Sequence, residues 1–124
     1  MDDYRSNSQS SPFILKIKDK GRERSINLYD VIFIEADGNY LKLQMENERV
    51  LIRNTMQQMI GNIDHGCFLR IHRSLIVNTN YMKLKSYKGN NEYSFRMKNG
   101  EEFTSGRSFK EEIDEFFSAN TKLT

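Results

Sequence analysis

Apolar and polar side chains alternate with a period of two along much of this chain. Residues 13–18, 40–45 and 93–98 show the alternation, which indicates strands with one buried face. Residues 31–34 form instead a continuous apolar run, and this pattern predicts a fully buried strand. Further strands are expected at 25–28, 49–53, 68–71, 75–77, 81–87 and 102–104, and Asn99-Gly100 predicts a two-residue hairpin turn.

The period changes to that of a helix in two places. Apolar residues at positions 56, 59, 60 and 63 fall on one helical face, and Thr55 with Gln58 forms a capping box before them. Ser108 with Glu111 forms a second capping box, at the start of an apolar face made of Phe109, Ile113, Phe116 and Phe117. The sequence therefore predicts a mainly β fold, with small antiparallel sheets and two short α-helices.

Composition and length indicate a single globular domain. The 124 residues suffice for one core, and 37% of them are hydrophobic. The polar stretch 1–12 ends at Pro12 and is interpreted as a flexible tail or interdomain linker, before a domain at 13–119 and a C-terminal tail at 120–124. The apolar runs are too short for a membrane span, and the acidic N-terminus is unlike a secretory signal. Together with a single cysteine, these features favour a cytoplasmic protein.

The net charge of +2 hides an uneven distribution. Residues 39–110 hold 12 Lys and Arg against 6 Asp and Glu, whereas residues 111–124 hold one against four. A basic surface attracts polyanions through counterion release, although an ordinary solvated face would show the same excess. Charge alone therefore leaves the partner open.

Catalytic and metal chemistry find little support in the sequence. Cys67 could pair with His65 or His72 as nucleophile and base, but no third orienting group stands at a recognisable spacing. The same three side chains match no structural zinc pattern and lack a fourth ligand. The glycines are scattered and form no phosphate-binding loop. We therefore expect neither an enzyme nor a bound metal or cofactor.

Three polar segments next to apolar strands are better candidates for a functional site. They are residues 37–42 (DGNYLK), 70–74 (RIHRS) and 105–110 (SGRSFK). Arg can bind guanine through two hydrogen bonds, Asn can do so with adenine, and Ser and Lys suit phosphates. Each segment taken alone is more simply an exposed turn. Three of them within one basic region favour a nucleic-acid interface.

Four sequence blocks carry a resemblance to a known family. In chain order they are VIFIEADGNYLKLQ, RNTMQQM, FLRIHRSLIVNTNYM and MKNGEEFTSGRSF. Their order and spacing resemble the LytTR family, and the resemblance covers residues 13–119. LytTR domains are DNA-binding output domains of bacterial response regulators. Their fold is mostly β, and they read bases in the major groove with loops instead of a recognition helix.

The resemblance implies specific roles for residues of the three segments. Bases would be contacted by Asn39 and Tyr40 in the first segment, Arg73 in the second and Arg107 in the third. For His72 we favour a supporting role, and Asn78 suits a turn as well as a contact. Contacts to the DNA backbone, or support for the base-reading residues, would come from Lys42, His72, Ser74, Ser105, Ser108 and Lys110.

The resemblance also implies partners. Family members bind double-stranded promoter DNA, usually at direct repeats, so two copies of the domain, as a homodimer on DNA, would be natural. They usually carry an N-terminal receiver domain, which is phosphorylated by a sensor kinase, and this sequence has no room for one. The linker-like stretch 1–12 favours an excised C-terminal piece over a stand-alone protein. Asp37 is accordingly interpreted as a turn residue and not as a phosphoacceptor.

Two other binding functions stay open at this point. A β-rich protein-interaction module would dock a partner on exposed edge strands or on the phenylalanine face of the last helix. A single-stranded nucleic acid would stack on tyrosines of a sheet face, although Tyr93 alternates with expected core residues. The tyrosines concerned are Tyr40, Tyr81, Tyr87 and Tyr93.

Overall fold

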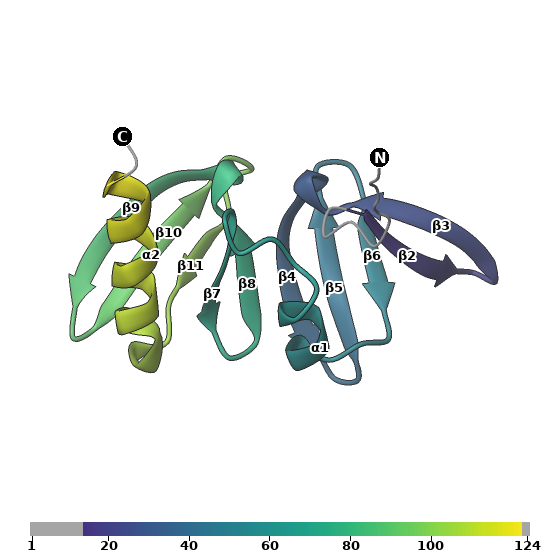
Figure 1. Cartoon of the computed structure of the whole chain (residues 1–124), viewed down its shortest axis with the longest axis horizontal. Coiled ribbons are helices and arrows are strands. Elements are labelled where there is room, and N and C mark those ends of the chain that lie inside the picture. Colours follow the sequence, from purple (N-terminus) through teal and green to yellow (C-terminus); the bar gives the residue numbers. More distant parts are fainter. Residues whose placement is uncertain (1–13, 123–124) are drawn as a thin grey trace, which may run out of the picture.

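The computed structural model describes residues 14–122, which form three antiparallel sheets and two α-helices (Figure 1). The predicted mainly β architecture is confirmed. The central sheet contains, in spatial order, β6 (Arg49–Ile52), β5 (Tyr40–Met45), β4 (Val31–Asp37), β8 (Leu75–Asn78) and β7 (Phe68–His72).

Two smaller sheets and two helices flank the central sheet (Figure 1). On one side lie the hairpin of β2 (Ile14–Asp19) and β3 (Arg22–Asn27) and the helix α1 (Met56–Ile60). On the other side lie α2 (Lys110–Lys122) and a sheet in the order β11 (Glu102–Thr104), β10 (Glu92–Met97) and β9 (Met82–Gly89). Short 3-10 turns complete the chain at η1 (Leu28–Asp30), η2 (Thr79–Tyr81) and η3 (Arg107–Phe109).

The central sheet separates two hydrophobic cores. Ile34 of β4 and Ile76 of β8 belong to the first core, together with side chains of β2, β3 and α1. Phe33 and Val77 of the same two strands belong to the second core, together with side chains of β10 and α2. A strand that is buried on both faces needs a continuous apolar run, because successive side chains point to opposite faces. The prediction of a fully buried strand at 31–34 is therefore confirmed.

The helix α1 starts as the sequence predicts but ends earlier. The hydroxyl of Thr55 accepts the amide hydrogen of Gln58 at 3.1 Å, and the side chain of Gln58 accepts that of Thr55 at 3.4 Å. This reciprocal arrangement is the predicted capping box. The helix ends at Ile60, so Ile63 reaches the first core from the loop that follows and not from the helix.

The start of α2 differs from the prediction. The chain reaches this helix through η3, which begins after Gly106, and α2 itself starts at Lys110. Ser108 lies inside that turn, so the second predicted capping box is wrong. The predicted apolar face is confirmed: Ile113 is fully buried, and three phenylalanines pack partly buried against the second core. The helix continues to Lys122, so residues 120–122 belong to α2 and not to a tail.

The hairpin at Asn99-Gly100 forms, but with a different turn. A two-residue type I′ turn needs positive φ at both residues, and here Gly100 has φ +96° while Asn99 does not. The amide of Gly100 instead donates to the carbonyl of Met97 at 2.9 Å, as in a longer turn. Two-residue loops with positive φ at both positions occur at Lys20-Gly21 and Asn90-Asn91.

The proposed N-terminal tail at 1–12, together with Phe13, lies outside the described residues, as do residues 123–124. Within residues 14–122 no helix is long and apolar enough to cross a membrane.

Asn78 fixes the end of β8 in the middle of the fold. Its side chain is fully buried, and its amide donates to the carbonyls of Val31 at 2.9 Å and Tyr29 at 3.2 Å. Its side-chain oxygen accepts the amide hydrogen of Asn80 at 3.0 Å. These three bonds give Asn78 a structural role, which resolves the alternative that the sequence left open.

We therefore predict that Asn78→Ala lowers the free energy of unfolding by about 3 kcal/mol, because it leaves buried carbonyls and an amide without partners. Chemical denaturation followed by circular dichroism measures the change. Asn80→Ala, at an exposed position of the adjoining turn, should change stability little. Equal stabilities of the Asn78→Ala variant and the parent would contradict this role.

Cys67 is a buried thiol of the first core, 7% exposed. Burial raises the pKa of the thiol to about 11, and the nearby Asp64 carboxylate acts in the same direction. The thiolate is the reactive form, so the folded protein should react with iodoacetamide at pH 8 about a hundredfold more slowly than the unfolded protein. Mass spectrometry of alkylation time courses, with and without denaturant, measures both rates. Equal rates would show that the thiol is as accessible and as readily ionised in the folded protein as in the unfolded one, which would contradict its burial.

Candidate nucleic-acid interface

The three predicted segments come together at one edge of the molecule. The turn between β4 and β5, the turn between β7 and β8, and the link from β11 to α2 all lie along the lower edge in Figure 1. We call this the turn edge, and it carries Asn39, Arg73 and Arg107. All three of these side chains are exposed.

Main-chain hydrogen bonds connect the three segments. The amide of Ala36, just before the first turn, donates to the carbonyl of Ser74 in the second at 2.9 Å. The amide of Gly106, in the third segment, donates to the carbonyl of Ile71 at 2.9 Å. The segments are therefore held at fixed positions relative to one another by bonds that do not involve side chains.

The first segment contains a tight turn between β4 and β5, and this turn begins with a glycine. Gly38 adopts φ +61°, a conformation that residues with a side chain rarely take, and Asn39 follows at the tip. Tyr40 opens β5 and is 44% exposed. Lys42, two residues further into β5, is half-buried and pairs with Glu35 of β4 at 3.4 Å. The segment thus presents an amide and a phenol at its tip, with an ammonium group behind them.

The second segment is braced from within, which leaves Arg73 exposed. The Nδ1 atom of His72 lies 3.0 Å from the Ser74 hydroxyl and accepts the Ser74 amide hydrogen at 3.2 Å. These contacts support the role that we favoured for His72. Arg70 donates to the carbonyls of His72, at 3.3 Å, and of Arg73. The sequence analysis assigned no role to Arg70, because its partners are main-chain carbonyls that only the folded turn brings within reach.

The third segment contains both buried and exposed polar residues. Ser105 is 2% exposed, and its hydroxyl accepts the amide hydrogen of Tyr93 at 2.9 Å. This contact fits the supporting alternative for Ser105. At Gly106, an added Cβ would come within 3.3 Å of the Phe109 ring of the same segment, so the packing of this ring favours glycine. Arg107 and Ser108 follow and point outward as exposed side chains.

Lys110, the last candidate of the third segment, forms an ion pair with an acidic side chain. It donates to Asp114, one turn further along α2, and Tyr93 donates its hydroxyl hydrogen to the same carboxylate. The bond from Lys110 holds the pKa of Asp114 below its usual value, and the bond to Asp114 raises the pKa of Lys110. The ammonium group therefore stays charged, but Asp114 offsets part of its attraction for a phosphate.

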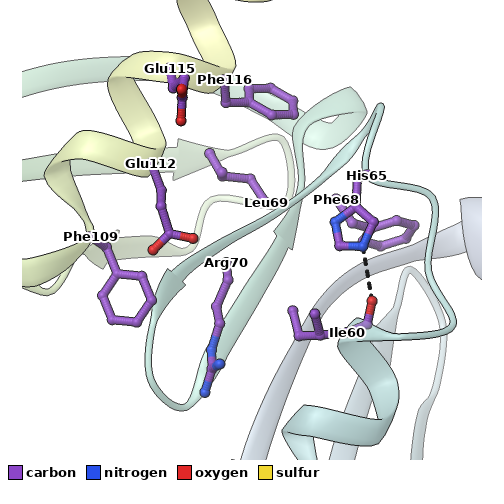
Figure 2. A pocket seen from close by; sticks show the side chains of 9 residues that line it. All are labelled: Ile60, His65, Phe68, Leu69, Arg70, Phe109, Glu112, Glu115 and Phe116. Atoms are coloured by element: carbon purple, nitrogen blue, oxygen red, sulfur yellow. Dashed lines mark hydrogen bonds between the residues drawn. The ribbon is translucent and has the colours of Figure 1, made fainter.

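The residues considered for catalysis or zinc are engaged elsewhere. A hollow of about 380 Å³ lies between β7 and α2, and Figure 2 shows the side chains that line it. At this hollow, the Nε2 atom of His65 lies 2.9 Å from the carbonyl of Ile60. His72 is bound to Ser74, and the Cys67 thiol lies against the carbonyl of Asp64 at 3.9 Å. Among the described residues, no group of three or more His, Cys, Asp and Glu side chains could hold a metal ion.

The tyrosines and phenylalanines of the two alternative functions serve mainly in packing. Tyr81 and Tyr93 pack partly buried against the second core, as do the phenylalanines of α2. Tyr40 and Tyr87 are exposed, but they belong to different sheets. The four tyrosines therefore do not form one stacking platform for a single strand.

Known proteins resemble this chain over most of its length. Residues 21–118 match the sequence profile of the LytTr DNA-binding domain. A solved structure described as the LytTr DNA-binding domain of a response regulator from Bacillus cereus superposes with a TM-score of 0.75. At 20% identity, it covers 84% of this chain and 95% of that one.

Three curated relatives align with parts of the chain. The sensory transduction protein LytT of Bacillus subtilis is 23% identical over 88 residues, which are 71% of this chain and 36% of LytT. The transcriptional regulatory protein NatR of Bacillus subtilis is 33% identical over 67 residues, 54% of this chain and 29% of NatR. The heme-containing CO-sensing transcriptional regulator RcoM 2 of Paraburkholderia xenovorans is 30% identical over 69 residues, 56% of this chain and 26% of RcoM 2.

The aligned segments thus span about a quarter to a third of the relatives' own lengths. The sequence profile, in contrast, matches most of this chain, and the superposed structure has the same fold. The chain therefore belongs to the LytTr DNA-binding domain family, which consists of DNA-binding domains of transcriptional regulators and is not an enzyme family.

Proposed function

We propose that this domain binds double-stranded DNA sequence-specifically, as the DNA-binding part of a bacterial transcriptional regulator. Side chains on the turn edge would enter the major groove and read bases there. The observation that carries this proposal is the convergence of Asn39, Arg73 and Arg107, from three separate segments, as exposed side chains on one edge. Amide and guanidinium groups are the side-chain groups that form two hydrogen bonds with adenine and guanine.

We propose roles for the candidate residues from the exposure and the hydrogen bonds of each side chain. Asn39, Tyr40, Arg73 and Arg107 are exposed and would contact bases. Backbone phosphates would be bound by Lys42, Ser108 and Lys110, which lie beside them, whereas His72, Ser74 and Ser105 would hold the turns in place. Because the turns are already connected by main-chain bonds, little conformational entropy would be lost on binding.

We also propose how many copies of the domain bind DNA together and which further domain a longer regulator would contain. A domain this small covers few base pairs, so two copies on direct repeats, as a homodimer on DNA, would give a longer recognition sequence. The matched relatives are much longer than the aligned segment, which supports a further domain in a longer regulator. We propose that this further domain is a receiver domain controlled by a sensor kinase. Such a regulator would act in the cytoplasm, where its promoters are.

The alternative is a protein-interaction module without DNA binding. Its best support is β9, an edge strand in which residues 83–88 are all exposed. Selection of bound sequences from a random duplex library at low salt separates the two functions. Enrichment of a motif supports DNA reading, whereas no enrichment favours the interaction module. Competition with single strands in the same assay tests the stacking alternative.

Base-reading arginines should determine both affinity and preference. We predict that Arg73→Ala and Arg107→Ala each cost about 1–3 kcal/mol on the selected site and relax the preference at one base position, because a two-hydrogen-bond contact is lost. Fluorescence anisotropy with the selected duplex and its single-base variants measures both effects. Asn39→Ala should likewise relax the preference at a third position.

Arg22→Ala is the matched control, because Arg22 is exposed on the β2–β3 hairpin, away from the turn edge (Figure 1). It should leave base preference unchanged. If Arg73→Ala and Arg107→Ala both bound the selected site as tightly as the parent, the assignment of base contacts to the turn edge would be wrong.

The ion pair between Lys42 and Glu35 offers two substitutions that should change DNA affinity in opposite directions. Lys42→Ala should weaken binding to all duplexes alike and reduce the slope of log affinity against log salt by about one, because one phosphate contact is lost. Glu35→Gln should strengthen binding to all duplexes, because it removes a negative charge 3.4 Å from the Lys42 ammonium. Titrations at several salt concentrations measure both. No change in either variant would remove Lys42 from the interface.

A further inference from the structure

Arg53 lies at the turn edge although it belongs to none of the three segments. Leu41 of β5 pairs with Ile52 of β6, so the next position along the two antiparallel strands places Arg53 opposite Tyr40. The guanidinium carbon of Arg53 is 6.0 Å from the centre of the Tyr40 ring, within range of a cation–π contact. Arg53 is therefore held beside the first base-reading turn.

The charge of Arg53 is not neutralised within residues 14–119, whose side chains the structure describes. Two arginines of the sheets have carboxylate partners: Arg24 pairs with Glu48 at 2.8 Å, and Arg96 pairs with Glu102 at 2.9 Å. Arg53 is exposed and has no such pair in that part of the chain. Arg73 and Arg107, the two arginines proposed to read bases, likewise lack a carboxylate partner there, as do Arg22, Arg49 and Arg70. The position beside Tyr40, and not the unpaired charge alone, therefore singles out Arg53.

A hollow of about 430 Å³ opens between the first turn and the start of α1. Hydrogen-bond donors surround it, including the side chains of Asn39, Arg53 and Asn54. The Asn54 side-chain oxygen accepts the amide hydrogen of Thr55 at 2.8 Å, which leaves the NH₂ group of Asn54 as a donor. A guanidinium and an amide on one rim are suited to the oxygens of a phosphate.

From this arrangement we propose that Arg53 is a fourth DNA contact, which binds a backbone phosphodiester beside the base read by Asn39. The inference rests on the proposed function. Tyr40 would act in two ways, through its own contact with DNA and as the surface against which the guanidinium is held. Arginine suits this position better than lysine, because its planar group can stack on a ring and offer two parallel hydrogen bonds to one phosphate.

The position of Arg53 favours a phosphate over a base. Asn39 and Tyr40 stand at the tip of the first turn, whereas Arg53 follows the neighbouring strand β6, outside that turn. When the tip of the turn enters a DNA groove, residues outside the tip meet the sugar–phosphate backbones that form the walls of the groove. The contact with the Tyr40 ring holds the guanidinium of Arg53 beside that ring, so that it does not project beyond the tip of the turn.

The test compares Arg53→Ala with Arg49→Ala. Arg49 is also exposed on β6 but lies at its other end, where it donates to Gln44 at 3.0 Å. We expect Arg53→Ala to weaken binding about tenfold on every duplex, and to reduce the salt slope by about one, without changing base preference. Arg49→Ala should match the parent. Arg53→Lys should keep the salt slope and lose part of the affinity.

Two outcomes would overturn the proposal. Arg53→Ala could bind as the parent does, or it could relax the preference at one base position, which would make Arg53 a base reader. Thermal unfolding of each variant shows whether the exposed substitution leaves the fold intact, and Arg53→Gln repeats the test with less loss of packing. If Arg73→Ala and Arg107→Ala lose binding while Arg53→Ala does not, only this inference fails. If none of the three loses binding, the proposed function fails as well.

Discussion

Burial of β4 and β8 from both sides is the constraint on which the rest of the structure depends. Phe33 and Ile34 are adjacent in sequence, yet they enter different cores, and each buried side chain of this size contributes about 1.5–3 kcal/mol. A strand with two apolar faces has a weakly specified register, since a slip by one residue would still bury apolar side chains. Specific contacts then help to fix the register, and the bond from the buried amide of Asn78 to the carbonyl of Val31 is one of them at the end of β8.

The geometry of the turn edge is determined by the central sheet. Two of its segments are the connections of neighbouring strand pairs, and the third is attached to them through the amide of Gly106. The side chains of Arg70 and His72 then brace the second turn from inside, so that Arg73 projects from it. The groups that we propose to read bases are thus placed by the packing of strands and not by a helix.

Much of this could be predicted from the sequence, because patterns of period two and 3.6 report directly which side chains are buried. The apolar run at 31–34 and the capping box at Thr55 are examples, and both depend on neighbouring residues only. The start of α2 was mispredicted because the chain first forms the turn η3 after Gly106, whose amide is bound to the carbonyl of Ile71 in a distant segment. The supporting role of Ser105 and the position of Arg53 also depend on pairing across strands, which local patterns do not contain.

The bonds between the three segments of the turn edge join main-chain atoms, from Ala36 to Ser74 and from Gly106 to Ile71. Asn39, Arg73 and Arg107 contribute no buried surface to either core. Their side chains can therefore be exchanged for others at little cost in folding, while the backbone that carries them keeps its shape. If these side chains read bases as we propose, stability and DNA preference are separable properties of the domain, and new target sequences could be acquired through point substitutions on an unchanged scaffold.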